Sequence, residues 1–501
     1  MGVQTADPEA STRTATVIRH LNGVVLAALA TGVVVRIQIL AGPGGRLDAD
    51  EAVIGLMARH LLEGEWTTFY WAQEYGGSQE VALAAGAFAI FGASTLVLKT
   101  LTIVLHAIAG VLVWLLGRRT VGEPFARVGT ALYWIWPAVF LVTSTRARGY
   151  YEFGLIAALL VLYLATKIDE EPTLPLVAAF GLSCGLGWWA TPQIVLVAVP
   201  AVLWLLYRRR ELVRKLPIGA IAAAIGAAPW LVHNIRHDWP SLGLTSSPPS
   251  GTNTYLDHLD AFFTQGLPAA LGLTHVMSDR WIFPAVVGGT LYIAVLIGFA
   301  VLALRRKRPS LLVLVMLLCP FLVSLSPFAW FVIEPRYLYF AAPVFALLLA
   351  RLLSRPIPQA VALVAIASLS VVSVQEWQSD IEAYEASGQS DGLQPGDLDS
   401  LIAELQRREV NAVFTDYWNA YRISFASEEE VIATSLGHVR YSPHHDYVRN
   451  HEAPAYVFIR GSESESSFST ALSSLGMSAE TFEAGLFVVH VPEQRVLPEE
   501  L

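Results

Sequence analysis

"LNGVVLAALATGVVVRIQILAGPGGRLDADEAVIGLMARHLLEGEW", residues 21–66, joins three patterns that decide the fold. A long apolar run comes first, and a helix of roughly 20 such residues crosses a hydrocarbon core of about 30 Å. Three acids, Asp48, Asp50 and Glu51, follow within four positions. Apolar residues then recur at helical spacing over 51–62. The stretch predicts a transmembrane helix whose edge carries clustered carboxylates at the start of an amphipathic helix.

Long apolar runs recur through the first three quarters of the chain. Of its 501 residues, 54% are hydrophobic and 15% are charged, whereas about a quarter are charged in soluble proteins. Arg13 and Arg19 ahead of the first run are also typical of a signal peptide, but ten further runs favour an uncleaved anchor. The composition predicts an all-α polytopic membrane bundle. We place eleven spans at 18–40, 96–117, 124–144, 150–167, 173–190, 192–208, 216–235, 282–304, 310–330, 337–354 and 357–374.

The orientation of these spans follows from their flanking charges. With a cytoplasmic N-terminus, the inner flanks hold 17 Lys or Arg residues and the outer flanks hold 7, as the positive-inside rule requires. This assignment needs 78–92 to lie along the outer surface as an interfacial helix. The first loop (41–95), the loop 236–281 and the tail from 376 are then extracytoplasmic parts of a multi-pass protein of the cell membrane.

The C-terminal part differs from the rest in charge. From Glu376 onward the chain has 22 acidic residues and 7 arginines, and the part before it has 20 acidic residues and 26 Lys or Arg. An acidic tail after a basic membrane part argues for a soluble domain and against nucleic-acid binding. We therefore predict a transmembrane domain over 1–375 and a small α/β domain over 376–501. The domain's helical patterns lie at 397–409 and 467–476, and its strand patterns at 411–417, 429–435, 455–461 and 485–492.

Ionisable side chains gather at the predicted outer ends of four spans, and such residues near a bilayer often mark functional sites. The four clusters are Asp48/Asp50/Glu51, Arg146/Arg148/Glu152, His233/His237/Asp238 and Glu334/Arg336/Tyr337. The arginine fork binds two phosphate oxygens at once, and free carboxylates can act as a base or a metal ligand. Together they indicate a reaction on a lipid-linked phosphate.

Each cluster also has a purely structural explanation. Asp48 and Glu51 fit a capping box, which leaves Asp50 unexplained. The arginines of the second cluster could reach lipid headgroups. His233 and His237 have an i, i+4 spacing that could bind a metal, but without a third ligand interfacial hydrogen bonding is the simpler explanation. The last cluster fits a local ion pair at a helix start.

The order of these elements resembles the membrane glycosyltransferases of the GT-C superfamily. The nearest likeness is to the branch of protein mannosyltransferases and aminoarabinose transferases (glycosyltransferase family 39-like). An N-terminal span followed by an outer loop in which an Asp-Glu pair opens a surface helix carries the resemblance. Three further stretches support it: "FYWAQEYGGSQEVALAAGAFAIFG" (69–92), "LLGRRTVG" (115–122) and "EPRYLYF" (334–340). The resemblance covers about 1–375.

The resemblance implies transfer of a sugar from a polyprenyl-phosphate donor to an envelope lipid, glycan or protein on the outer membrane face. The family's proposed general base falls on Asp50, and Glu51 beside it is the second predicted catalytic residue. Arg336 matches the arginine that contacts phosphate, and Arg148 the arginine that ends the third-span motif. In an inverting transfer a carboxylate takes the acceptor's proton, and the departing lipid phosphate needs cations rather than an acid.

One position departs from the family pattern. Close relatives often have "ARPD" where this chain has "ARGY", so Tyr150 stands where a second acid would be, and Glu152 could substitute for it. Asp48 is a candidate ligand for a divalent cation, Mg²⁺ or Mn²⁺, although several members of this branch do not need one. The remaining predicted substrate-binding residues are Arg146, His233, His237, Glu334 and Tyr337.

Two other function classes compete with this assignment. A transporter or flippase for a lipid-linked sugar would place ionisable residues along a path at membrane mid-depth, often within inverted repeats, whereas the charges here gather at one face. A non-catalytic scaffold subunit would not need its outer acids and arginines to share a geometry.

Overall fold

The computed structural model describes residues 8–243, 254–276, 278–305, 310–326, 335–386, 395–396 and 398–501. Its chain divides into two compact units. The helical unit comprises Met1–Ile39, Thr102–Thr145 and Tyr150–Trp377, and the loop–sheet unit comprises Leu40–Leu101, Arg146–Gly149 and Gln378–Leu501. The first loop therefore groups with the C-terminal part of the chain.

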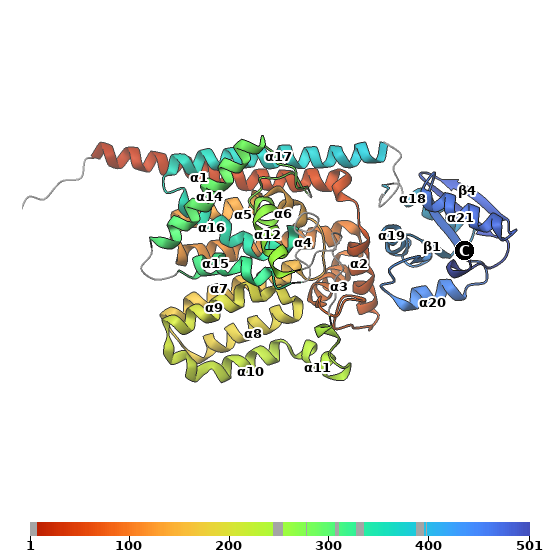
Figure 1. Ribbon diagram of the computed structural model, residues 1–501, viewed down its shortest axis with the longest axis horizontal. Coiled ribbons are helices and arrows are strands. Elements are labelled where there is room, and N and C mark those ends of the chain that lie inside the picture. The colour runs from red at the N-terminus through yellow and green to blue at the C-terminus, as the bar shows by residue number, and fades with distance from the viewer. Residues whose placement is uncertain are drawn as a thin grey trace, which may run out of the picture. The chain divides into compact units, whose positions relative to one another are not determined.

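The helical unit consists mainly of α-helices (Figure 1). Within it, α8 packs on α7 and α10, α9 on α7 and α15, and α16 on α5. The 3₁₀ segment η6 (Pro335–Ala341) precedes α16. The helices are α1 (Pro8–Ala41), α4 (Thr95–Thr120), α5 (Glu123–Ile135), α6 (Ala138–Thr143), α7 (Tyr151–Glu170), α8 (Leu174–Ala190), α9 (Val195–Arg208), α10 (Leu216–Gly226), α11 (Ala228–Arg236), α12 (Tyr255–Ala261), α13 (Leu267–Ala270), α14 (Ala285–Leu304), α15 (Leu311–Val323), α16 (Ala342–Leu352) and α17 (Pro356–Ala386).

Among the described residues, fewer helices than the predicted eleven are long and apolar enough to cross a membrane. Five qualify by length and composition: Arg19–Ala41, Thr95–Thr120, Tyr151–Glu170, Ala285–Leu304 and Pro356–Ala386. A sixth is possible if Arg210–Gly226 and Ala228–Arg236, bent by 69°, count as one span. Other predicted spans are shorter helices or are interrupted. The run 124–144, for example, breaks between α5 and α6 at Pro137, because proline has no N–H for the helical ladder.

Glycines allow α8 and α10 to approach closely. A Cβ at Gly181 would lie 2.1 Å from the carbonyl oxygen of Gly219, and a Cβ at Gly185 would lie 2.0 Å from that of Ala223. The two glycines are four residues apart on one face of α8. Such small-residue stripes are typical of helix packing in membrane proteins, where close backbone contact replaces the hydrophobic driving force.

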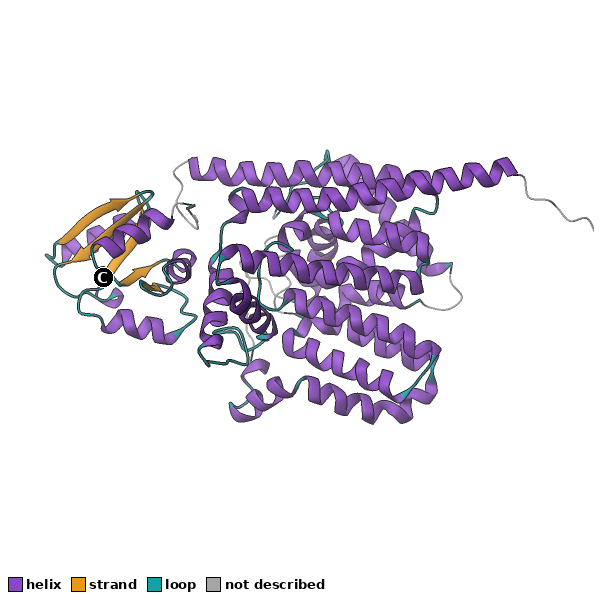
Figure 2. Cartoon of the chain, turned by 180° about the vertical axis from the view of Figure 1, so that it is seen from behind, coloured by secondary structure: helices purple, strands orange, loops and turns teal. Residues whose placement is uncertain are grey.

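The strands of the described chain lie in the loop–sheet unit, where Figure 2 draws them in orange. They form one five-stranded sheet in the order β2-β1-β3-β5-β4. Strand β1 pairs in parallel with β2 and β3, and β5 pairs antiparallel with β3 and β4. Its elements are α2 (Ala49–Leu62), α3 (Gln79–Phe91), α18 (Leu398–Arg407), β1 (Ala412–Thr415), α19 (Tyr417–Ala426), β2 (Ile432–Ser435), α20 (Ser442–Asn450), β3 (Ala455–Ile459), α21 (Glu463–Ser474), β4 (Ala479–Ala484) and β5 (Phe487–Pro492).

The four predicted strands are present, and β4 is a fifth that the sequence pattern did not indicate. β4 lies at the sheet edge and exposes both of its glutamates. An edge strand buries only part of one face, so its sequence lacks the apolar run that identified its partner β5.

The first loop and the C-terminal sheet share one hydrophobic core. α2 packs against both α3 and α19. A Cβ at Gly55 of α2 would come within 2.4 Å of the Phe425 ring, so this glycine lets α19 lie close. Met57 and Phe88 belong to the same core as Val413 of β1. Residues from distant parts of the sequence are thereby fixed around the N-terminus of α2.

Candidate active site

The predicted capping box at the start of α2 is present. Asp48 is the N-cap, and its Oδ1 accepts a hydrogen bond from the Glu51 backbone N–H at 2.9 Å. The Glu51 carboxylate in turn accepts from the Asp48 N–H at 3.1 Å. The box satisfies two N–H groups that a helix start otherwise leaves unpaired.

Glu51 is buried, and both of its carboxylate oxygens accept hydrogen bonds. Its two oxygens accept hydrogen bonds from Lys99 Nζ at 2.8 and 2.7 Å, and Oε1 also accepts from the Ala147 backbone N–H at 2.9 Å. The side chains of Glu51 and Lys99 are only 1% and 2% exposed. A buried ion pair of this kind fixes the segments that carry it, here α2, α4 and the turn 146–149.

Asp50 has the most exposed side chain of the three acids, at 20%. Its Oδ2 accepts from Arg148 at 2.7 Å, and its Oδ1 accepts from the Tyr417 hydroxyl at 2.5 Å. Arg440 Nη2 lies 3.7 Å from Oδ1, and the Tyr70 hydroxyl donates to the Asp50 backbone carbonyl at 3.1 Å. Asp50 is thus held by residues from the first loop, the turn 146–149 and the C-terminal domain.

Arg148 connects the two aspartates. One of its nitrogens bonds to Asp50, and the other lies 2.9 Å from Asp48 Oδ2. Burial by itself would raise the pKa of Asp48, but the charges of Arg148 and Arg146 and the hydrogen bond from Glu51 keep that pKa below its usual value. Asp48 therefore remains ionised and keeps Arg148 in place beside Asp50.

Tyrosines and a second arginine complete the surroundings of Asp50. Burial and the charge of Asp50 raise the pKa of Tyr417 and of Tyr70 above that of a free phenol, so both remain protonated. The Arg440 guanidinium lies over the rings of Tyr70 and Tyr417, at 5.2 and 5.5 Å from the ring centres. The carboxylate is therefore oriented by two cations and a phenol.

Glu152 belongs to the helical unit, where it takes part in a buried polar network. Its Oε1 accepts from the Tyr339 hydroxyl at 2.5 Å, and that hydroxyl is 2.7 Å from His106 Nδ1. The Tyr133 hydroxyl also lies 3.0 Å from His106 Nδ1. Arg36 of α1 is also buried in the helical unit. It donates hydrogen bonds to Ser144 Oγ and to backbone carbonyls, and its guanidinium lies 3.9 Å from the centre of the Trp134 ring.

The other predicted substrate-binding residues also belong to the helical unit. The Arg336 guanidinium lies 5.7 Å from the centre of the Tyr151 ring. His233 and His237 stack at 4.3 Å between ring centres, and His237 Nδ1 lies 2.8 Å from the His233 carbonyl oxygen. Tyr337 is half-buried in η6, and Glu334 lies outside the described residues.

The structure thus brings together Asp48, Asp50, Glu51 and Arg148, with Arg146 close enough to act on the charge of Asp48. The phosphate-contacting role of Arg336 stays a prediction. Sequence reasoning missed Lys99, Tyr70, Tyr417 and Arg440. A lysine inside an otherwise apolar predicted span was the signal for Lys99, and the aromatic-rich stretch 414–425 was the signal for Tyr417.

A second group of titratable residues lies at the other end of α2. His60 Nε2 and His444 Nε2 are each 2.8 Å from Glu429 Oε1. The hydrogen bond with Glu429, opposed by burial and aided by Glu65, raises the pKa of His60 to about 9. Burial would raise the pKa of Glu429, but its bonds to His444 and His60 lower it to about 2. Among the described residues, these three could hold a metal ion, because their ligand atoms lie within 4.8 Å of one another.

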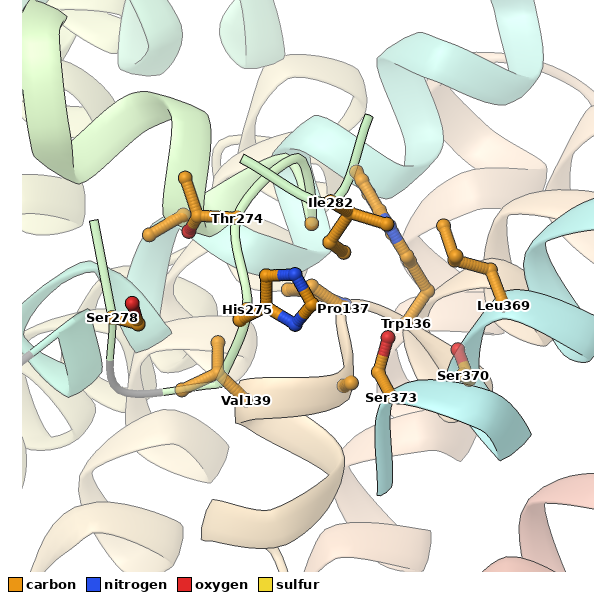
Figure 3. A pocket seen from close by; sticks show the side chains of 13 residues that line it. Trp136, Pro137, Val139, Thr274, His275, Ser278, Ile282, Leu369, Ser370 and Ser373 are labelled. Carbon is orange, nitrogen blue, oxygen red and sulfur yellow. The ribbon is translucent and has the colours of Figure 1, made fainter. Parts of the chain in front are cut away.

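A small pocket in the helical unit has different chemistry. Figure 3 shows His275 among the lining side chains, which include Trp136, Ser370 and Ser373. The space amounts to about 10 Å³, roughly one water molecule. No carboxylate and none of the predicted site residues is among its lining residues.

Comparison with known proteins identifies solved structures with a similar fold. No family model and no curated protein matches the chain. ArnT from Cupriavidus metallidurans bound to undecaprenyl phosphate is similar with a TM-score of 0.63 at 13% identity, covering 94% of this chain and 98% of that one. An oligosaccharyltransferase from Archaeoglobus fulgidus, in complex with Zn and sulfate, is similar with a TM-score of 0.52 at 13% identity, covering 93% and 72%. Both are GT-C glycosyltransferases.

The chain has the GT-C fold. The same archaeal oligosaccharyltransferase, tethered to an acceptor peptide containing the NVT sequon, gives a TM-score of 0.53 at 14% identity, covering 95% of this chain and 74% of that one. The likeness to ArnT includes nearly the whole of both chains, so the GT-C fold extends over the helical unit and the loop–sheet unit together.

Proposed function

We propose that this protein is an inverting glycosyltransferase that moves a sugar from a polyprenyl-phosphate donor to an envelope lipid, glycan or protein. The observation that carries the proposal is Asp50. It is a carboxylate at the start of α2 in a GT-C fold, oriented by Arg148 and Tyr417 and still partly exposed. Helix capping accounts for Asp48 and the buried pair with Lys99 accounts for Glu51, whereas Asp50 is paired with Arg148 and still keeps 20% of its side chain exposed.

The chemistry assigns separate tasks to acids and cations. The acceptor hydroxyl or amine attacks the anomeric carbon, and Asp50 takes its proton as the new bond forms. The bond from that carbon to the phosphate oxygen breaks, and its electron pair leaves with the polyprenyl phosphate. Arg146, Arg148 and Arg336 are the candidates to stabilise this leaving charge.

Glu51 and Asp48 are assigned positioning roles. Glu51 fixes α2 to Lys99 and to the turn 146–149, and Asp48 holds Arg148. Asp48 also remains the candidate ligand for a Mg²⁺ or Mn²⁺ ion bound with the donor phosphate. Binding of donor lipid further involves Glu152, Glu334, Tyr337, His233 and His237 in this proposal.

The proposed topology puts this chemistry outside the cytoplasm. It has a cytoplasmic N-terminus, an extracytoplasmic first loop and an extracytoplasmic C-terminal domain, as the flanking charges favour. The similar ArnT structure is bound to undecaprenyl phosphate and the similar oligosaccharyltransferase to an acceptor peptide, which supports a lipid donor and an envelope acceptor.

The test is Asp50→Asn in the purified full chain, reconstituted in liposomes with a panel of polyprenyl-phosphate sugars and envelope acceptors. We expect transfer to fall by at least 10³-fold while donor binding changes by less than threefold. Glu63→Gln, an exposed acid just after α2, is the matched control and should retain activity. Full transfer by Asp50→Asn would overturn the assignment. Mass spectrometry of envelope glycans in a deletion strain would identify the acceptor.

A transporter of a lipid-linked sugar is the second candidate, and one observation favours it. Arg36, His106 and Glu152 are ionisable groups buried among apolar helices, as transport pathways often have. The same network is closed by hydrogen bonds to Tyr339, Ser144 and backbone carbonyls. Movement of a fluorescent lipid-linked sugar across liposomes, without any transfer product, would support transport instead.

A further inference from the structure

The C-terminal end of α2 has a group of possible metal ligands that take no part in the proposed catalysis by Asp50. His60 lies in the last turn of α2, Glu429 in the turn after α19, and His444 in α20. Both imidazole Nε2 atoms point at the same oxygen, Glu429 Oε1, each at 2.8 Å. The end of α2 and two neighbouring segments of the C-terminal part thus present two nitrogens and one carboxylate oxygen to one point.

We propose that His60, Glu429 and His444 bind a Zn²⁺ ion that clamps the first loop to the C-terminal domain. Two imidazoles and a carboxylate are a donor set that zinc takes in proteins, with water in the fourth position. Mg²⁺ and Mn²⁺ prefer oxygen ligands, so this site differs in chemistry from the one at Asp48.

Groups around the three ligands are arranged as support for such a site. Glu65 Oε2 lies 2.9 Å from His60 Nδ1, which leaves Nε2 of His60 to face the proposed ion. The Tyr441 hydroxyl donates to the same Glu65 oxygen at 2.9 Å. A carboxylate behind a ligating histidine fixes the ring and its tautomer, as in many zinc sites.

The two histidines are also buried, and Glu429 has an unusual backbone conformation. His60 and His444 are 8% and 5% exposed, and the stacked rings of Trp71 and Tyr441 lie beside them. Glu429 has a φ of +66°, a left-handed conformation that residues other than glycine rarely adopt. The Glu429 carboxylate lies within hydrogen-bond distance of both imidazoles.

The metal-free alternative is a chain of ion pairs in which protons occupy the imidazoles. Such a chain and a zinc site use the same atoms, so geometry alone supports both, and metal content separates them. Zinc would connect the end of α2 opposite Asp50 to two segments of the C-terminal domain. The proposal does not depend on Asp50 being the catalytic base.

The experiment measures zinc in the full chain purified in detergent without chelator. We expect about one Zn²⁺ per chain by elemental analysis, loss of it on dialysis against chelator, and a rise in thermal midpoint when Zn²⁺ is restored. Co²⁺ in its place should give the visible absorption of a four-coordinate site with nitrogen and oxygen ligands.

Variants assign the ligands. Glu429→Gln keeps the shape of the side chain and should weaken Zn²⁺ binding at least tenfold, and His444→Ala should do the same. His445→Ala, which changes the neighbouring histidine bonded to Thr434, should leave zinc binding unchanged. Zinc content near zero in the unmodified chain, with no thermal shift on adding Zn²⁺, would overturn the proposal. Equal zinc binding by unmodified protein and Glu429→Gln would do so too.

Discussion

Carboxylates only a few residues apart at one helix start have different surroundings in this protein, and their surroundings set what they can do. Asp48 caps the helix and holds Arg148. Glu51 is buried against Lys99. Asp50, between them in sequence, points to a partly open position lined by Tyr417 and Arg148. Since a general base must reach its substrate, exposure as well as charge supports Asp50 as the proposed base.

The buried ion pair predicts a large loss of stability when one partner is removed. Lys99→Met leaves Glu51 charged, buried and without its cation, a change that costs about 3–5 kcal/mol. We expect the free energy of unfolding to fall by that amount in chemical denaturation of the full chain. The double variant Lys99→Met/Glu51→Gln should recover part of the loss, because no unpaired charge remains. Equal stability of Lys99→Met and the unmodified protein would contradict the ion-pair role.

The hydrogen bond from the Tyr417 hydroxyl to Asp50 predicts that its removal slows transfer with little effect on stability. Tyr417→Phe removes the hydrogen bond to Asp50 Oδ1, and hydrogen bonds to charged groups contribute about 1.5–3 kcal/mol. We expect kcat for transfer to fall roughly 10- to 100-fold, with donor KM and thermal midpoint nearly unchanged. Tyr447→Phe, an exposed tyrosine of α20, is the control. A change in KM alone would indicate that Tyr417 contacts the substrate rather than positioning Asp50.

At the scale of elements, short-range signals decided where helices begin and end. The strand pattern over 411–417 is cut short because Asp416 caps α19, accepting the backbone N–H of Trp418 at 2.8 Å. The run 124–144 is divided at Pro137. In both places one side chain overrides an apolar pattern, because it changes which backbone N–H groups can be paired.

The close contact of α8 with α10 predicts sensitivity to a single methyl group. Gly185→Ala puts a Cβ where the Ala223 carbonyl oxygen leaves no space, and overpacking of this kind costs about 1–3 kcal/mol. We expect a lower thermal midpoint in detergent. Gly289→Ala in α14, where nothing lies within 4 Å of an added Cβ, should match the unmodified protein. Equal midpoints for the two variants would contradict the close packing.

At the scale of the whole molecule, the first loop and the C-terminal sheet are parts of one unit. Their shared core includes Met57 of α2 and Phe425 of α19, and the residues around Asp50 come from both. The surroundings of the proposed base are therefore incomplete in either segment alone.

This shared core predicts the result of ending the chain at Ala386. Without the sheet, apolar side chains of α2 lose the partners they are buried against. We expect backbone amides of α2 to exchange with deuterium at least tenfold faster than in the full chain, while amides of α8 exchange at their former rate. Unchanged protection of α2 would show that the first loop is stable without the C-terminal domain.

The sequence by itself determined the apolar helical class, the α/β character of the C-terminal part, the capping box at Asp48 and the resemblance to GT-C proteins. The first three follow from composition, periodicity and local spacing, which are properties of neighbouring residues, and the resemblance follows from motifs and the order of elements. Only the tertiary structure decided that Lys99 neutralises Glu51, that Arg148 joins Asp48 to Asp50, and that His60 meets Glu429 and His444. Such pairings depend on how distant segments pack around a common core, and no short-range pattern specifies that packing.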